Sequence, residues 1–233
     1  MSNYIYIYRA SNSIYRFLLN NLYSCKLDKN KYVEIPLVYS ESEIEQVIFG
    51  SLLGDAHLEM RKKNINARFS FVQSERHFDY FLHVWEIITQ LTPCSFKKLS
   101  YVDKRTNKLY TSYVFRSRVN PIYTKFHLLF YSNGKKIVPL DLSLLTPLAI
   151  AHWVAQDGTK STSGGFYFCT DNFSHIECQR LLDYISEKYK LNCSLHKTSK
   201  GSNRIYIKAS SLLGLKDLII SRLHPSMLYK ITK

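Results

Sequence analysis

The stretch VIFGSLLGDAHLEM at residues 47–60 is an apolar run that ends in an acidic residue, Asp55. Its apolar part has the composition of a buried helix. A carboxylate at the C-terminal end of a helix is electrostatically unfavourable, because that end carries partial negative charge. A second stretch, TPLAIAHWVAQDGTKS at residues 146–161, ends in the same way at Asp157. The recurrence indicates that both acidic residues are placed for a purpose.

The segments that follow the two acidic residues, which stand 102 positions apart (157 − 55), also match each other. Each copy shows a strand pattern, a helix pattern, two further strand patterns and a closing helix pattern. These segments are 67–74, 76–91, 95–103, 108–118 and 121–132 in the first copy, and 164–171, 174–189, 192–199, 202–210 and 211–223 in the second. The sequence therefore predicts an α+β fold of two pseudo-symmetric αββαββα repeats, at 44–140 and 141–233, after an N-terminal extension at 1–43.

Both opening helices have start signals and small residues on one face. Ser42 and Glu45 form a capping-box pattern, and Thr146 stands before Pro147 as a cap before a first-turn proline. The small residues lie one turn apart, at Gly50 and Gly54 and at Ala151 and Ala155. Packing against a sheet would explain them equally well in a single helix. In a repeat, we expect the two helices to pack on each other, so that their acidic ends meet.

The charge of the chain predicts a polyanionic partner. Lys and Arg number 32 against 18 Asp and Glu, which gives a net charge of +14 and an isoelectric point near 9.5. Such an excess is typical of nucleic-acid-binding proteins. The basic residues are spread along the chain, whereas a membrane-surface protein would gather them on one amphipathic helix. No apolar run is long enough to span a membrane.

The cysteines and histidines argue against a zinc protein. Five cysteines without a CxxC pair suggest a reducing compartment, and the eight histidines form no zinc-ligand motif. The N-terminus shows no secretory signal. Tyr, Phe, Ile, Asn and Lys have AT-rich codons, so their abundance suggests the genome of an organelle, a mitochondrion or a chloroplast.

The strand patterns alternate between apolar and polar residues, so each sheet would bury one face and expose the other. A polar, basic sheet face suits contacts with phosphates and base edges, although a plain solvated face shows the same alternation. The predicted DNA contacts are Arg68, Ser70, Lys98, Ser100, Thr111, Tyr113, Arg116 and Arg118 in the first copy, and His196, Thr198, Arg204, Tyr206 and Lys208 in the second.

The segments FGSLLGDAH (49–57) and AIAHWVAQDG (149–158), each followed by the same element pattern, resemble the signature helices of single-chain LAGLIDADG homing endonucleases. The resemblance covers roughly residues 44–233 and is nearest to the monomeric type encoded in organellar group I introns. NGKKIVP (133–139) and HPSMLYKI (224–231) also resemble that group. The resemblance implies that the two repeats pack through the signature helices, with their sheets forming a saddle over the DNA major groove.

The resemblance also implies a shared active site with two or three divalent ions, expected to be Mg²⁺. Asp55 and Asp157 would bind the metal, and the backbone carbonyls of Gly54 and Gln156 would add ligands. Hard oxygen ligands suit this cation. The second signature departs from the family pattern, because His152 and Gln156 replace small residues. The two helices should therefore pack less symmetrically than in an ideal pair.

Three further catalytic residues are expected from the resemblance. Lys136 and Lys230 would lie beside the scissile phosphates, although the neighbouring Lys135 leaves the choice within the first pair open. Gln73 matches a position that orders water in related enzymes, whereas its counterpart in the second copy is Thr170, which puts a symmetric role in doubt.

The implied activity is site-specific cleavage of both strands of a long, asymmetric double-stranded DNA site. The alternative is a group I intron maturase, a splicing cofactor that uses the same fold to bind intron RNA. Because RNA binding does not need metal-binding acids, the presence of both Asp55 and Asp157 favours cleavage. A DNA-binding regulator is a third possibility, but the chain has no helix-turn-helix signature.

Overall fold

The structure is a computed structural model of the 233-residue chain that describes residues 38–61 and 65–232. The predicted N-terminal extension at 1–43 therefore lies almost wholly outside the described residues. One unit comprises Glu41–Lys233 and contains both predicted repeats. The repeat boundaries themselves remain a prediction.

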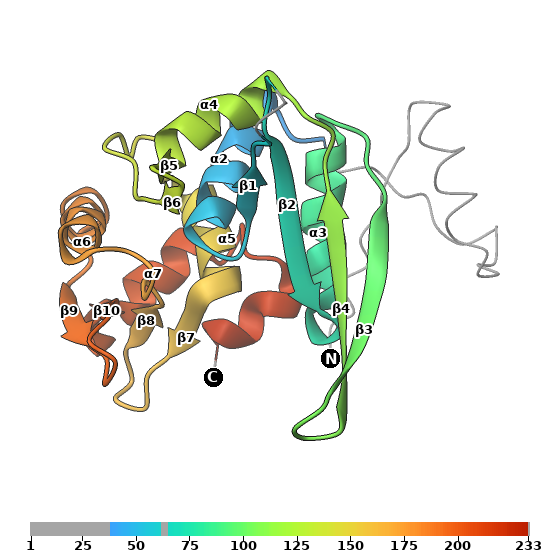
Figure 1. Ribbon diagram of the computed structural model, residues 1–233. Helices are drawn as coiled ribbons and strands as arrows, with labels where there is room; N and C mark the ends of the chain where they lie inside the picture. Colours follow the sequence, from blue (N-terminus) through green and yellow to red (C-terminus); the bar gives the residue numbers. More distant parts are fainter. Residues whose placement is uncertain (1–37, 62–64, 233) are drawn as a thin grey trace, which may run out of the picture. The chain divides into compact units, whose positions relative to one another are not determined.

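The first half begins with α2 at Glu41–Leu53 and contains a four-stranded antiparallel sheet in the order β1-β2-β4-β3 (Figure 1). Its strands are β1 (His57–Glu59), β2 (Arg68–Ser74), β3 (Phe96–Asp103) and β4 (Lys108–Arg116). The remaining elements are η1 (Glu75–His77), α3 (Phe78–Thr89), α4 (Pro121–Phe130) and the short pair β5 (Tyr131–Ser132) and β6 (Lys135–Lys136).

The second half repeats this arrangement, with a sheet in the order β7-β8-β10-β9. Its elements are α5 (Pro147–Asp157), β7 (Gly158–Lys160), β8 (Phe166–Phe168), α6 (His175–Tyr189), β9 (Cys193–Lys197), β10 (Asn203–Ile207), η2 (Ala209–Ser211), α7 (Leu212–Ile219) and η3 (Pro225–Lys230). The matching strand orders confirm the α+β fold of two αββαββα copies. The strands β1 and β7 have three residues each, too few for an alternation pattern to predict them.

The helices α2 and α5 pack directly on each other between the two halves (Figure 1). The two backbones meet at Gly50, where an added Cβ would lie 2.1 Å from the carbonyl oxygen of Ala149. At the beginning of the pair, the Thr146 hydroxyl donates a hydrogen bond of 2.6 Å to Gln46 Oε1. The expected packing of the two helices is therefore confirmed, and a glycine is needed where the backbones meet.

The predicted start is correct for α5 but not for α2. Thr146 caps α5 as predicted, with its hydroxyl accepting from the Ala149 amide and Pro147 in the first turn. The prediction for the first helix is wrong, because α2 begins at Glu41 and Ser42 lies inside its first turn. The capping-box pattern begins two residues after Ser40, the residue that directly precedes the helix.

Aromatic side chains form much of the core of each half. In the first half, Phe71 stacks on Phe81 with ring centroids 6.1 Å apart, so the inner face of β2 packs on α3. In the second, Trp153 of α5 stacks on Phe168 of β8 at 4.1 Å. All four side chains are fully buried. Each sheet therefore turns its other face away from these helices.

Candidate active site

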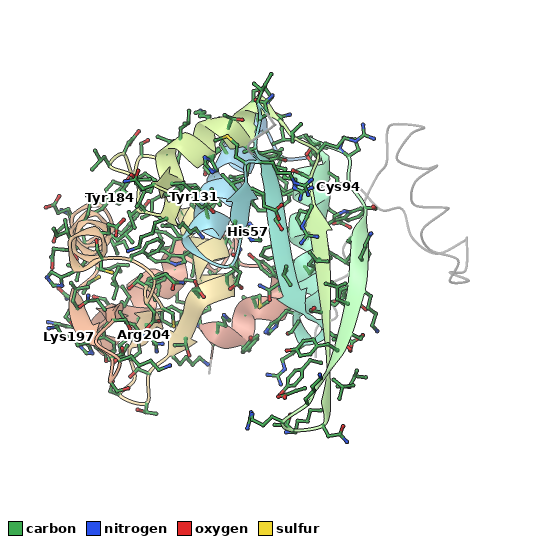
Figure 2. All side chains as sticks on the ribbon, viewed as in Figure 1. His57, Cys94, Tyr131, Tyr184, Lys197 and Arg204 are labelled. Atoms are coloured by element: carbon green, nitrogen blue, oxygen red, sulfur yellow. The ribbon has the colours of Figure 1, made fainter. Side chains whose placement is uncertain are left out.

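The two signature aspartates lie where α2 and α5 end. Asp157 is the last residue of α5 and is half-buried, whereas Asp55 is exposed and stands two residues beyond the last residue of α2. Two residues further on is His57, the first residue of β1, which Figure 2 labels. The packing of the two helices thus brings together two carboxylates that are 102 positions apart in the sequence.

The two carboxylates interact electrostatically. Burial raises the pKa of Asp157, and the negative charge of Asp55 raises it further, to about 7. Lys136 and Lys230 act in the opposite direction. A bound cation would relieve both the burial penalty and the repulsion. Among the described residues, no cluster of three or more His, Cys, Asp and Glu side chains could hold a metal, so the ligands here would be two carboxylates and main-chain oxygens.

Two lysines occupy equivalent places beside the aspartates. Lys136 Nζ donates to the carbonyl oxygens of Gly54 at 3.2 Å and Ala56 at 2.8 Å. Lys230 Nζ donates to the carbonyl oxygen of Gln156 at 2.9 Å. Each lysine therefore bonds the residue immediately before an aspartate. The carbonyls predicted as metal ligands are thus hydrogen-bonded to ammonium groups in this structure.

Burial lowers the pKa of both ammonium groups, that of Lys136 to about 8 and that of Lys230 below its ordinary value. The two aspartates partly oppose this effect by raising both pKa values. Lys135, which precedes Lys136 in β6, is exposed and lies near Glu177 instead. Of the two adjacent lysines, the structure brings Lys136 to the carboxylates.

Two glutamines hold the first aspartate. Gln73, buried near the end of β2, donates from Nε2 to Asp55 Oδ2. Its counterpart Thr170 donates instead to the carbonyl oxygen of Asn203, at 2.7 Å. The side chain of Gln156 crosses from α5 and accepts a hydrogen bond from the Asp55 amide at 2.8 Å. The expected asymmetry between Gln73 and Thr170 is therefore present in the geometry.

The sequence analysis missed the two residues that anchor Gln156. Its Nε2 donates to Ser51 Oγ at 3.0 Å and to the Tyr80 hydroxyl at 2.9 Å. Ser51 looks like one more small residue of the first signature, and Tyr80 like one aromatic residue of an amphipathic helix. The only available signal was Gln156 itself, a polar residue where the family pattern has a small one.

The prediction that the polar strand residues of the first copy share one face is wrong. In the β3–β4 register Lys98 pairs with Tyr113, and Tyr113 packs on Phe78 beside α3 with ring centroids 4.3 Å apart. Lys98, Ser100, Thr111 and Tyr113 therefore lie on the helix-covered side of the sheet. Arg116 lies on the other face, where it pairs with Ser70. The cause is that Tyr113 packs as a core aromatic residue, although its hydroxyl made it look polar. Ser70 is fully buried, so the prediction that it contacts DNA is wrong.

A charged network occupies the open face of the first sheet. Glu59 of β1 accepts hydrogen bonds from Arg68 and from Arg116, the latter at 3.1 Å. Burial raises the pKa of Glu59, but the two guanidinium groups outweigh it and lower the pKa to about 2. Arg118 lies two residues beyond β4 and is exposed. Arg68 and Arg116, two of the arginines predicted to contact DNA, are thus held by a carboxylate on this face.

The open face of the second sheet is aromatic. Tyr167, His196 and Tyr206 form a cluster in which the Tyr167 hydroxyl bonds His196 Nδ1 at 2.9 Å and His196 stacks on Tyr206 at 4.6 Å. Arg204 pairs with His196 across the strands and binds Asp171 at 2.9 Å. Figure 2 labels Arg204 and Lys197 on this sheet. The structure therefore brings three of the five predicted contacts of this copy to one face, while Thr198 and Lys208 lie just beyond the strand ends.

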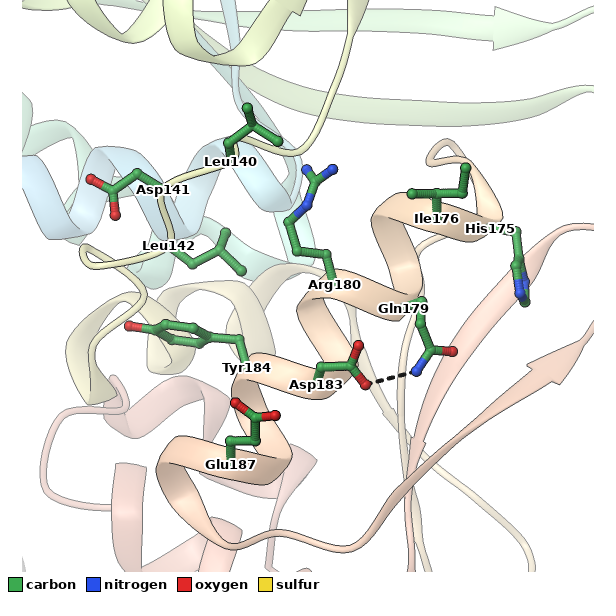
Figure 3. Close-up of a pocket in the computed structure, with 10 residues that line it drawn as sticks. All are labelled: Leu140, Asp141, Leu142, His175, Ile176, Gln179, Arg180, Asp183, Tyr184 and Glu187. Carbon is green, nitrogen blue, oxygen red and sulfur yellow. Dashed lines mark hydrogen bonds between the residues drawn. The ribbon is translucent and has the colours of Figure 1, made fainter.

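A separate cleft of about 660 Å³ lies between α6 and the segment 140–142 (Figure 3). Its lining includes Leu140, Ile176 and Tyr184, and Gln179 donates to Asp183 across one turn of α6 at 2.8 Å. None of the predicted site residues lines it.

Comparison with known proteins gives consistent matches. The model of the LAGLIDADG DNA endonuclease family matches residues 45–215. The cytochrome b mRNA maturase bI2 of Debaryomyces hansenii is 31% identical over 195 residues, 82% of this chain and 74% of that protein. The DNA endonuclease I-ChuI of Chlamydomonas applanata is 28% identical over 206 residues, 81% of this chain and 94% of that protein.

Solved structures share the fold. The homing endonuclease I-WcaI bound to its DNA recognition sequence superposes with a TM-score of 0.74 at 20% identity, over 91% of this chain and 96% of that one. A variant of I-DmoI in complex with its nicked target DNA, in the presence of Mn, gives a TM-score of 0.50 at 12% identity, over 77% of this chain and 96% of that one. Among the described residues, no helix is both long and apolar enough to cross a membrane.

Proposed function

This chain belongs to the LAGLIDADG DNA endonuclease family, and we propose that it is a homing endonuclease that cuts both strands of a specific DNA site by metal-dependent hydrolysis. One observation carries the proposal. Asp55 with Lys136, and Asp157 with Lys230, form two matched sets of groups where the paired helices end. A binding protein would have no need for two carboxylates that repel each other at this position.

The two carboxylates fit a divalent metal. The raised pKa of Asp157 marks a place where negative charge is insufficiently compensated. Asp55 and Asp157 would hold the ion, and their hard oxygen atoms suit Mg²⁺. When bound, such ions activate water and stabilise charge on the leaving oxygen of a phosphodiester.

The lysines and Gln73 would act on the substrate, on proton transfer and on the orientation of Asp55. Lys136 and Lys230 carry positive charge to the place where a scissile phosphate would lie, which would stabilise negative charge that develops on its oxygens. With a pKa of about 8, Lys136 Nζ can release or hold a proton near neutral pH. Gln73 fixes the orientation of the Asp55 carboxylate through its hydrogen bond to Oδ2.

The open faces of the two sheets would bind unequal halves of the DNA site. Arginines clamped by Glu59 dominate one face, whereas Tyr167, His196 and Tyr206 dominate the other. Two unlike faces in one chain suit a long, asymmetric target and need no second subunit, so we propose a monomer. The abundance of amino acids with AT-rich codons supports a place in an organelle.

A maturase that binds group I intron RNA is the second candidate. It is favoured by the 31% identity to a protein named as a cytochrome b mRNA maturase. The two functions share the fold but differ in their dependence on the aspartates. Substitution of Asp55 and Asp157 should abolish DNA cleavage. The same substitutions should leave the support of splicing intact.

The proposal is tested by selection for cleavage on a randomised duplex library in the presence of Mg²⁺. We expect one long, non-palindromic sequence, cut in both strands, to emerge. Retention of a group I intron RNA by the protein, together with no cut duplex at any Mg²⁺ concentration, would favour the maturase and overturn the endonuclease proposal.

A further inference from the structure

We infer that Gln156 is a positioning residue that holds Asp55 for cleavage of one DNA strand, so that the two strand cuts depend on different parts of the protein. The inference rests on the proposed function and deepens it. It starts from the fact that Gln156 belongs to the second repeat, whereas the aspartate that it binds belongs to the first.

The hydrogen bonds of Gln156 join both active-site halves. Its side-chain Oε1 accepts from the Asp55 amide at 2.8 Å, and its main-chain carbonyl accepts from Lys230 at 2.9 Å. Its Nε2 is fixed by Ser51 and by Tyr80, whose hydroxyl also bonds His152 Nδ1 at 2.9 Å. These side chains are buried, so their geometry is strongly determined. Gln156 therefore has no freedom to swing away from Asp55.

The first aspartate needs such a partner because the helix does not hold it. Helix α5 continues through Asp157, so helical geometry places that residue. Helix α2 ends at Leu53, and Gly54 and Asp55 form a turn beyond it. The amides of Gly54 and Ala56 bond main-chain carbonyls of α2, the latter that of Ser51 at 2.9 Å, whereas the Asp55 amide bonds a side chain of the other helix. Gln156 supplies that side chain.

The arrangement cannot be made symmetric. The position that corresponds to Gln156 in the first repeat is Gly54, which has no side chain to offer Asp157. An added Cβ on Gly54 would lie 2.8 Å from Gln156 Cβ and 2.7 Å from its Oε1. A side chain at one of the two positions thus excludes a side chain at the other. The contact between the two helices therefore has room for one glutamine, and of the two aspartates that glutamine bonds only Asp55.

A merely structural role for Gln156, as a satisfied polar group in the core, predicts different behaviour. It would lower stability on substitution and reduce both strand cuts equally. A positioning role predicts that the Asp55 amide and one strand cut change, whereas the other cut is preserved.

The test compares Gln156→Met, which keeps side-chain length but removes both polar atoms, with Gln46→Met. The control removes the hydrogen bond between Thr146 and Gln46 at the other end of the same helix pair. Amide hydrogen exchange of Asp55 is measured by NMR in the free protein. Strand-resolved cleavage rates are measured on the selected site, and urea unfolding reports the stability of each variant.

In Gln156→Met we expect exchange at Asp55 to accelerate about tenfold, as for the loss of one hydrogen bond, and one strand to be cut about tenfold more slowly. The affected strand should be the one that Lys136→Met slows. Tyr80→Phe removes one anchor of Gln156 and should affect the same strand more weakly. Gln46→Met should leave both the exchange and the ratio of strand rates unchanged.

Unchanged exchange at Asp55 in Gln156→Met would overturn the inference, whether or not the protein cuts DNA. Equal slowing of both strands would also overturn it. If the wild-type protein cuts no duplex while exchange at Asp55 still depends on Gln156, the endonuclease proposal fails and the structural part of the inference is supported.

Discussion

Replacing Asp157 with asparagine should stabilise the metal-free protein, although the same change should abolish its activity. The pKa of Asp157 is raised from 3.8 to about 7 by burial and by Asp55. That difference corresponds to roughly 4 kcal/mol between the two protonation states. Because the folded state binds the proton more tightly, its stability is greatest below about pH 4 and falls as the pH rises to about 7. A neutral asparagine avoids this loss, so the advantage of Asp157→Asn should grow from about pH 4 and level off above pH 7.

The assay is urea unfolding of wild-type protein and of Asp157→Asn between pH 4 and pH 8, in the presence of a chelator. Asp171→Asn is the control, because hydrogen bonds from Ser202 and Arg204 outweigh burial and lower the pKa of Asp171. That variant should therefore be less stable than wild type by an amount that stays nearly constant above pH 4, because the pH-dependent part lies below the ordinary pKa of an aspartate. Added Mg²⁺ at pH 8 should stabilise wild type more than Asp157→Asn. A stability difference for Asp157→Asn that stays constant with pH would refute the reasoning.

Three further predictions concern packing, binding and catalysis. In urea unfolding, Gly50→Ala should lower the free energy of unfolding by about 2 kcal/mol or more, because its Cβ would lie 2.1 Å from a backbone oxygen. The control Gly214→Ala meets only a leucine methyl group at 3.3 Å, so it should be neutral or stabilising by up to about 1 kcal/mol. DNA affinity should fall by roughly 10³ to 10⁵ between 50 and 200 mM salt if about six to ten phosphates are contacted, and a flat response in a fluorescence titration would exclude this mode of binding. Lys136→Met and Lys230→Met should each slow the cleavage of one DNA strand by about 10²-fold, and the affected strand should differ between the two variants. Lys135→Met should cut supercoiled substrate like wild type. Equal loss of cleavage on both strands would show that neither lysine serves a particular strand.

The repeat was predictable because its signals are local and occur twice. The apolar runs that end at Asp55 and Asp157 and the matched strand patterns sufficed to infer two αββαββα copies. The strand faces were less predictable. Tyr113 counts as polar in an alternation pattern, but its ring packs on Phe78, so Thr111 and Tyr113 of β4 were assigned to the wrong face.

The site was predictable as far as equivalent positions in the two copies extend. Lys136 and Lys230 were found from their matched places near the ends of the copies, and the structure brings both to the aspartates. Gln156 could be noticed as a departure, but its partners Ser51 and Tyr80 could not, because hydrogen bonds between repeats depend on three-dimensional packing. Comparison of the two copies can show that Gln156 breaks the symmetry, but not which residues it bonds.

The central claim is that Asp55 and Asp157 are needed to cut DNA and not to bind it. The most direct test is a paired measurement of binding and cleavage for Asp55→Asn and Asp157→Asn, on the selected duplex with Mg²⁺. The account predicts that both variants bind the site with nearly wild-type affinity and leave both strands intact. Cleavage of either strand at the wild-type rate by both variants would contradict it and would place the active site elsewhere in the protein.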